Sequence, residues 1–356
     1  MGDALAITIS LGKKRPPPGV DLGSGWIKAV SLGLRRKKPF LEKLGRAPLG
    51  VAEQDKSEQA ASRLIELWQR LAIRDKMVVS AMTGHAVIIK RVTIPSEAAA
   101  NMELFLTKEA RQYIPFDLQD VYLDHQILGP GTKEGSLEVV LVASKKKEVQ
   151  ERLNILTRAG LETRVMDVDA FALNNCFEFN YPEFREKPQY LLDLGGQLSV
   201  FCVALRDQLV FQRELSLGGQ QLTDRLVKVL NKSRADCEKL KINGPGELSE
   251  QEQEVLFAEL DACISSWTSE IRRLMGFYVG SVPDSTAARN LFLSGGCSLL
   301  FGLKERLASE LQINIHYLDP WRKLVPDSGR FDPAYLQAVG PQFAVATGLA
   351  LREALA

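Results

Sequence analysis

A short motif occurs twice in this chain, and the distance between its copies limits the folds open to the sequence. The first copy reads GVDLGSGWIKAV from residue 19, and the second reads YLLDLGGQLSVF from residue 190. In each copy an apolar run ends in Asp-Leu-Gly, a glycine turn follows, and a second apolar run begins. Asp21 and Asp193 are 172 residues apart, about half of the 356-residue chain. The repeat therefore predicts two related halves that each open with a strand–turn–strand unit.

Helical and strand-like patterns alternate through the rest of the first half. Helices are expected over 57–71, over 96–113 with Ser96 as the N-cap, and over 148–159 with Gly160 as the stop. Strands are expected over 39–49, 123–128 and 137–143, with two more within 77–94. The segment 77–158 is therefore predicted to be an αβ subdomain inserted into the first half.

The second half has a more helical pattern. Helices are expected over 223–231, 233–240, 247–276, 299–311 and 342–355, and strands over 208–217, 291–293 and 313–317. The fold class is α/β. The predicted domains are a first-lobe core (1–76, 159–188 and the helix 342–356), the insertion 77–158, a second-lobe core (189–222 and 291–341) and a helical subdomain (223–290).

Composition and charge exclude several classes of function. Lys plus Arg total 45 and Asp plus Glu total 44, which argues against a protein that coats nucleic acid. No run approaches the ~18 uncharged apolar residues of a membrane span. The basic run 13–15 follows the short apolar stretch that ends at Leu11, which is the reverse of a secretory signal. The five cysteines are scattered without a CxxC pair, so we expect reduced thiols and no zinc site.

Glycine turns of this kind can hold a nucleotide. Backbone N–H groups of a turn cradle phosphate, and an adjoining carboxylate holds hydrated Mg²⁺. A single such turn is usually an ordinary hairpin, but a third turn, after a strand and before a helix, favours a nucleotide between them. The candidate ligands are Asp21, Gly23, Ser24, Gly25 and Lys28 in the first turn, Asp193, Gly195, Gly196, Gln197 and Ser199 in the second, and Gly295, Gly296 and Ser298 in the third. Asp21 and Asp193 are the predicted metal ligands, and Lys28 adds a positive charge for phosphate.

The order and spacing of the three turns resemble the actin-like ATPase superfamily, which includes actin, the heat-shock 70 chaperones, sugar kinases and the cell-division protein FtsA. The resemblance implies a two-lobed, ribonuclease H-like fold with duplicated halves and an FtsA-like inserted subdomain. It implies ATP and Mg²⁺ as cofactors, and it makes Asp169 the candidate catalytic carboxylate near the metal. Asp167, or simple capping of a helix by Asp169, is the alternative reading of that segment.

The same resemblance extends the candidate site toward the adenosine. It places Gly218, Gly219, Glu238 and Lys241 near the nucleotide. An exposed, charged helix face would give the same pattern at Glu238 and Lys241, so both readings stay open.

Five stretches are similar to the PilM family of type IV pilus assembly proteins: 109–121, 159–172, 217–223, 318–321 and 346–352. That resemblance implies a cytoplasmic scaffold, peripheral on the inner face of the inner membrane and able to self-associate. Its groove beside the inserted subdomain would take the N-terminal cytoplasmic peptide of the membrane protein PilN, and other pilus assembly proteins would be further partners.

Other members of the superfamily are alternatives. A cell-division protein of the FtsA type would carry an amphipathic helix after the fold, and a type II secretion protein would continue into a transmembrane segment. This chain ends at Ala356, inside the last expected helix. A small-molecule kinase of the sugar-kinase type is less favoured, because no substrate motif is recognisable.

Two positions after the second turn depart from the superfamily pattern. Gln197 stands where a glycine or an acidic residue is usual, and Leu198 replaces the first of two threonines, so that only Ser199 keeps a hydroxyl. Catalysis of phosphoryl transfer depends mainly on positioning and charge stabilisation. We therefore expect nucleotide binding with slow or undetectable hydrolysis.

Overall fold

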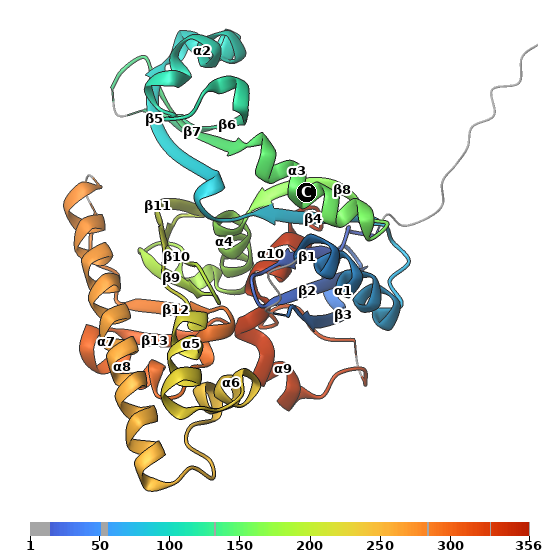
Figure 1. The fold of residues 1–356 in the computed structure, drawn as a ribbon. Helices are drawn as coiled ribbons and strands as arrows, with labels where there is room; N and C mark the ends of the chain where they lie inside the picture. Colours follow the sequence, from blue (N-terminus) through green and yellow to red (C-terminus); the bar gives the residue numbers. More distant parts are fainter. Residues whose placement is uncertain (1–14, 51–55, 132, 283–284, 328, 356) are drawn as a thin grey trace, which may run out of the picture.

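Two five-stranded sheets with the same strand order form the centre of the molecule (Figure 1). The computed structural model describes residues 15–50, 56–131, 133–282, 285–327 and 329–355. The first sheet has the order β3-β2-β1-β4-β8 and the second β11-β10-β9-β12-β13. In both sheets three strands form an antiparallel meander and two more join in parallel. The predicted duplication is thereby confirmed at the level of topology.

The strand bounds follow the predicted apolar runs closely. The first sheet contains β1 (Gly19–Leu22), β2 (Trp26–Arg35), β3 (Lys38–Pro48), β4 (Met77–Met82) and β8 (Glu162–Val168). The second contains β9 (Gln189–Leu194), β10 (Ser199–Leu205), β11 (Gln208–Leu215), β12 (Asn290–Ser294) and β13 (Asn314–Tyr317). Corresponding hairpins even share their turn geometry, since Arg36–Lys37 and Arg206–Asp207 both have positive φ, as two-residue hairpin turns require.

Helices cover both faces of each sheet. Between the sheets lie α4 (Asp169–Asn180) and α10 (Ala344–Leu351), whose apolar side chains share one buried cluster with β4, β9 and β12 (Figure 1). On the outer face of the first sheet lie α1 (Lys56–Leu71) and α3 (Lys146–Arg158). The outer face of the second carries α5 (Gly219–Leu230), α7 (Glu250–Ser281) and α8 (Leu303–Leu311), and α6 (Arg234–Asn243) joins α5 to α7. Finally, α9 (Pro333–Val339) packs under β2 and β3.

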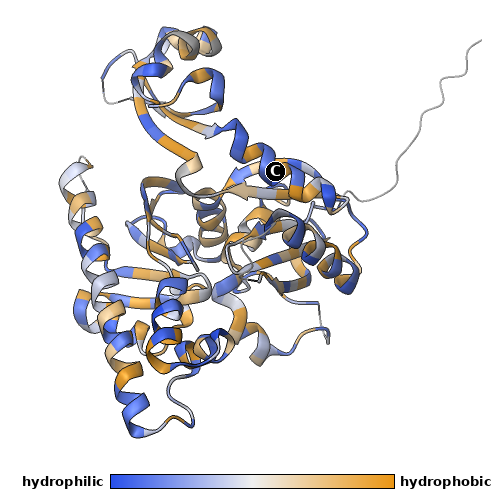
Figure 2. Cartoon of the chain, viewed as in Figure 1, coloured by the Kyte–Doolittle hydropathy of each residue, from blue (hydrophilic) through white to orange (hydrophobic). Residues whose placement is uncertain are grey.

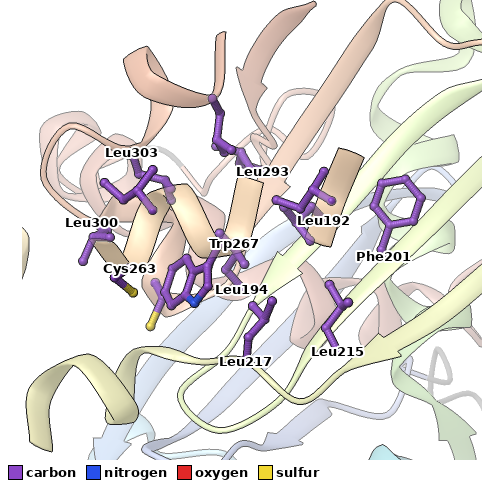
Figure 3. Packing of buried hydrophobic residues seen from close by; sticks show 14 of the residues in the cluster. Leu192, Leu194, Phe201, Leu215, Leu217, Cys263, Trp267, Leu293, Leu300 and Leu303 are labelled. Carbon is purple, nitrogen blue, oxygen red and sulfur yellow. The ribbon is translucent and has the colours of Figure 1, made fainter. Parts of the chain in front are cut away.

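The largest hydrophobic cluster lies under the second sheet. Figure 3 shows Leu192 and Leu194 of β9 directed toward Trp267 of α7, with Leu293 of β12 alongside. Trp267 is 4% exposed. A capping box between Ser249 and Glu252 begins α7, which satisfies backbone N–H groups that the first turn of a helix leaves unpaired. In Figure 2 orange and blue segments alternate along the helices, as is typical of helices with one buried face.

A small antiparallel sheet stands apart from the two lobes (Figure 1). It has the order β5-β7-β6 and contains β5 (Val87–Pro95), β6 (Val121–Pro130) and β7 (Ser136–Lys145), with α2 (Met102–Glu109) packed on it. The edges of the predicted insertion 77–158 differ from this unit, because β4 pairs within the first sheet and α3 packs on α1. The apolar faces of β4 and α3 are buried in the first lobe. The predicted division of the chain into domains stays a proposal.

The predicted N-cap at Ser96 is wrong. Ser96 begins a 3-10 turn that runs to Asn101. The side chain of Asn101 accepts the hydrogen bond from the backbone N–H of Leu104 and caps α2. A Ser after a strand resembles an N-cap in sequence, but the turn that follows has the tighter 3-10 winding and delays the α-helix by six residues.

No helix among the described residues combines the length and apolar character needed to cross a membrane.

All five cysteines are buried and unpaired, as the scattered spacing predicted. Burial raises the pKa of Cys176 and Cys202 above the ordinary range of a thiol, so these thiols pack as small apolar groups.

Gly348 of α10 lies tightly against α4, and this gives a stability prediction. A Cβ at this position would lie 1.7 Å from the carbonyl oxygen of Ala172 in α4. We expect Gly348→Ala to lower the free energy of unfolding by at least about 3 kcal/mol, because two packed helices would have to separate. Denaturant unfolding measures this change. The matched control is Gly276→Ala in α7, where a Cβ meets nothing within 4 Å and helix propensity should add up to about 1 kcal/mol. Equal stabilities of the two variants would contradict the packing argument.

Candidate functional site

The first turn is built around a buried ion pair. Asp21 at the end of β1 lies directly opposite Lys28 in β2. The Nζ of Lys28 is 2.6 Å from Oδ2 of Asp21, and both residues are 9% exposed. Burial alone would lower the pKa of Lys28, but Asp21, Asp193 and Asp169 outweigh burial and raise it. Lys28 is therefore a fixed positive charge among three carboxylates.

The second and third turns meet beside this pair. Asp193 at the end of β9 lies opposite Ser294 of the parallel strand β12. The hydroxyl of Ser294 donates to Oδ1 of Asp193 at 2.8 Å. Burial raises the pKa of Asp193, and the charge of Lys28 opposes that shift. Gly295 follows with φ of +86°, a conformation that glycine adopts without strain.

Asp169 is the third carboxylate, and it enters from the first residue of α4. Burial and the nearby charge of Asp21 raise its pKa to about 7, against the opposing effects of Arg152 and of a hydrogen bond with Thr83. Asp167, the alternative candidate, lies elsewhere and has Arg352 3.4 Å away. Of the two acidic residues, the structure brings Asp169 to the turns.

The two glycine turns also touch each other directly. The backbone N–H of Gln197 donates to Oγ of Ser24 at 3.2 Å. Nε2 of Gln220 donates to the carbonyl of Ser24 at 3.5 Å. A Cβ at Gly196 would lie 2.8 Å from that Ser24 hydroxyl. The two halves therefore meet at the turns that the sequence repeat singled out.

The second turn is anchored on the start of α5. The N–H groups of Gly219 and Gln220 donate to the carbonyls of Gly195 and Gly196 at 3.1 and 2.8 Å. Gly218 has to be glycine because a Cβ there would lie 2.3 Å from the carbonyl oxygen of Gly196. The glycine pair 218–219 thus sets the position of the second turn.

Two predicted hydroxyl ligands form hydrogen bonds to backbone groups at the turns. Ser199 donates to the carbonyl of Leu217 at 2.9 Å and accepts from the N–H of Gly195. Ser298 donates to the carbonyl of Gly295 at 2.7 Å. Both residues are buried, so this geometry fits a role in shaping the turns better than direct contact with a ligand.

Lys241 lies under the start of α5. It is 2% exposed, and its Nζ contacts the carbonyl of Gly219 at 3.1 Å, Oγ1 of Thr223 at 2.8 Å and Oε2 of Glu238 at 2.8 Å. An exposed helix face is therefore excluded for Lys241. The Glu238 side chain is 45% exposed and covers the ammonium group from outside.

Sequence reasoning missed four residues of this site: Thr83, Arg152, Gln220 and Ser294. Arg152 reaches from α3 to donate to the carbonyl of Leu22 at 3.0 Å, at the end of β1. Ser294 and Gln220 had a local signal, since Ser294 immediately precedes Gly295 and Gln220 immediately follows Gly219. Thr83 and Arg152 come from segments distant in the sequence from the glycine turns.

The donor set is suited to a hydrated cation. Among the described residues, no three His, Cys, Asp or Glu side chains converge as a direct metal cage. The charges of Asp21 and Asp193 nevertheless lie close enough to Asp169 to raise its pKa. Burial makes Asp169 and Asp193 costly to ionise. Magnesium keeps several waters and uses one or two carboxylates, so these residues fit it without a closed cage.

The raised pKa of Asp169 predicts a pH dependence of stability. Because the folded value of about 7 exceeds the ordinary 3.8, the folded state holds an extra proton between these values, and its stability falls as pH rises through this window. Asp169→Asn removes this loss. In the absence of Mg²⁺ and nucleotide, we expect the variant to gain on the wild type by about 2 kcal/mol between about pH 5 and about pH 8. Thermal unfolding across this range measures the gain, and a difference that does not change with pH would contradict it.

A groove of about 520 Å³ lies beside the turns, between the small sheet and the second sheet. Its walls include successive residues of two strands, 87–91 of β5 and 209–214 of β11. Both strands are edges of their sheets. Asp169 and Thr83 line this groove as well, so one carboxylate belongs to both the groove and the turn site.

Contacts at the two ends of the groove show how its edge strands, β5 and β11, are oriented. At one end, a Cβ at Gly84 would lie 3.1 Å from Cδ1 of Leu198 and 3.7 Å from a carboxylate oxygen of Glu214. At the other end, Arg91 donates to Oε1 of Gln208 at 2.6 Å. Residue numbers rise along β5 while they fall along β11, so the strands run antiparallel across the groove.

The duplicated sheets, the helices between them and the opposed glycine turns define the actin-like two-lobed class of proteins. Two solved structures share this fold: the ethanolamine utilization protein EutJ from Carboxydothermus hydrogenoformans (14% identity, 94% of this chain and 89% of that chain, TM-score 0.54) and MreB 5 of Spiroplasma citri bound to AMPPNP (12% identity, 96% and 97%, TM-score 0.51). Residues 19–354 match the family described as type IV pilus assembly protein PilM. The chain belongs to this family.

A further solved structure is much more similar. It is described as a PilM-PilN type IV pilus biogenesis complex, and it matches this chain with 27% identity over 95% of this chain and 98% of that chain, at a TM-score of 0.83. The likeness therefore extends over the lobes and the small sheet alike.

Proposed function

We propose that this chain is an ATP-binding scaffold of type IV pilus assembly that takes the N-terminal peptide of a PilN-like membrane protein in the groove between β5 and β11. The family and the similar PilM-PilN complex support the partner. The observation that carries the proposal is the groove itself, because the edge strands of two sheets face each other across it. Extended peptides bind such edges by backbone hydrogen bonds, while apolar side chains fill the pocket.

The nucleotide would bind between the glycine turns with Mg²⁺ held through water by Asp193 and Asp21. Lys28 would oppose the phosphate charge, and the glycine turns would supply backbone N–H groups. Bound Mg²⁺ supplies charge neutralisation for phosphate oxygens. Leu198 follows the second turn where a hydroxyl would help to position the γ-phosphate, so hydrolysis is slow or undetectable. An ATPase rate clearly above the buffer blank and lost in Asp193→Ala would contradict this.

The shared residue Asp169 links the two sites. A nucleotide that changes the surroundings of Asp169 also changes one wall of the groove. A ligand shifts a conformational equilibrium only through different affinities for the two states. We propose that nucleotide binding sets the shape of the groove in this way, and that the protein is held at the inner face of the inner membrane through its partner.

A calorimetric titration tests the partner. A synthetic peptide of the N-terminal cytoplasmic residues of the PilN-like protein from the same genome is titrated into the full chain, with and without Mg-ATP. We expect one peptide per chain and an affinity that differs between the two conditions. Absence of binding in both conditions would overturn the peptide proposal, and equal affinities would overturn the coupling to nucleotide.

A further inference from the structure

One wall of the groove continues onto the C-terminal end of α7. Phe211 of β11 lines the groove and is buried, and its ring centroid lies 6.0 Å from that of Phe277 in α7. The guanidinium of Arg213 lies 4.8 Å from the centroid of Phe211 and 5.4 Å from that of Phe277. Arg213 therefore contacts both rings, which joins strand and helix into one surface.

This end of α7 differs from the rest of the helix in its exposed residues. Phe277 is 47% exposed, on the side of the helix that adjoins Arg213. No charged residue follows Arg273 within α7. A half-exposed aromatic side chain beside an arginine has the composition of the centre of a protein–protein interface.

We propose that the surface of Phe277 and Arg213 is a second part of the docking site, which takes an apolar side chain of the bound peptide just outside the groove. The inference rests on the proposed peptide function and extends it from the groove to the second lobe. The groove walls span about six residues of extended chain, so a longer peptide has to leave the groove and cross a neighbouring surface. The aromatic ring of Phe211 makes the α7 surface continuous with the groove wall.

Two half-exposed phenylalanines on the same helix give a matched comparison. Phe257 is 43% exposed and also has an aromatic neighbour, Phe301, but it lies near the other end of α7. We expect Phe277→Ala to weaken binding of the PilN-like N-terminal peptide about tenfold, and Phe257→Ala to change it less than twofold. Fluorescence anisotropy of the labelled peptide measures both affinities.

A second measurement distinguishes contact from an indirect effect. In Phe277→Trp the peptide should shift the tryptophan emission to shorter wavelength, beyond the change in the wild type, because the indole loses water contact. Phe257→Trp should show no additional shift. If the wild type binds the peptide and Phe277→Ala binds it equally well, the α7 surface is not part of the site. If the wild type does not bind, the proposed function itself fails.

Discussion

Asp193→Ala should lose at least about 100-fold in affinity for Mg-ATP, equivalent to about 3 kcal/mol. Asp193 is partly buried between Lys28 and Ser294, where a bound cation would offset the cost of its charge. Alanine would remove that carboxylate, and only Asp21, which is already paired with Lys28, would be left of the two proposed metal ligands. Calorimetric titration with Mg-ATP and with ATP in chelator measures the loss and its dependence on the metal.

The matched control for this variant is Asp224→Ala in α5. Its carboxylate is 57% exposed and pairs with Arg234 on the surface, so the affinity for Mg-ATP should stay within twofold of the wild type. If Asp193→Ala binds Mg-ATP as tightly as the wild type, Asp193 is not a ligand of the metal. Failure of the wild type to bind would mean that the turns only hold the two lobes together.

Val140→Trp should abolish binding of the PilN-like peptide while leaving Mg-ATP binding intact. Val140 of β7 is partly buried and lines the groove next to β5. An indole there would occupy the space that an apolar side chain of the peptide needs. Because the groove wall at Val140 belongs to the small sheet, the turns are not altered.

The control is the same valine-to-tryptophan change at a position outside the groove. Val229→Trp on α5 serves, since Val229 is 49% exposed and is not part of the groove. Peptide and Mg-ATP titrations on both variants separate the two sites. Peptide binding by Val140→Trp at wild-type affinity would place the peptide elsewhere on the molecule.

The turns themselves could be predicted because their chemistry is local. Asp21 and Lys28 are opposite each other across a short hairpin, and the seven-residue spacing already implies that they meet. Asp193 and Ser294 likewise stand at the ends of predicted strands beside predicted glycine turns. For such residues, the strand bounds and the turn type decide the position of the side chain.

The hydrogen-bond partners of the site's side chains were less predictable. Ser199 and Ser298 looked like phosphate ligands, yet their hydroxyls bond to backbone carbonyls, that of Leu217 for Ser199 and that of Gly295 for Ser298. Lys241 read equally well as an exposed residue, yet it is buried under α5. A sequence identifies a donor, but the partner depends on which backbone groups the fold leaves nearby.

By itself the sequence determined the duplicated strand–turn–strand units, the third glycine turn and the similarity to the PilM family, because these depend on short-range patterns. Only the tertiary structure decided that Asp169 rather than Asp167 joins Asp21 and Asp193, and that Arg152 and Thr83 reach the same region. It alone produced the groove, whose walls are two strand edges more than a hundred residues apart in the chain. Their meeting depends on how the lobes and the small sheet pack, and no local pattern carries that information.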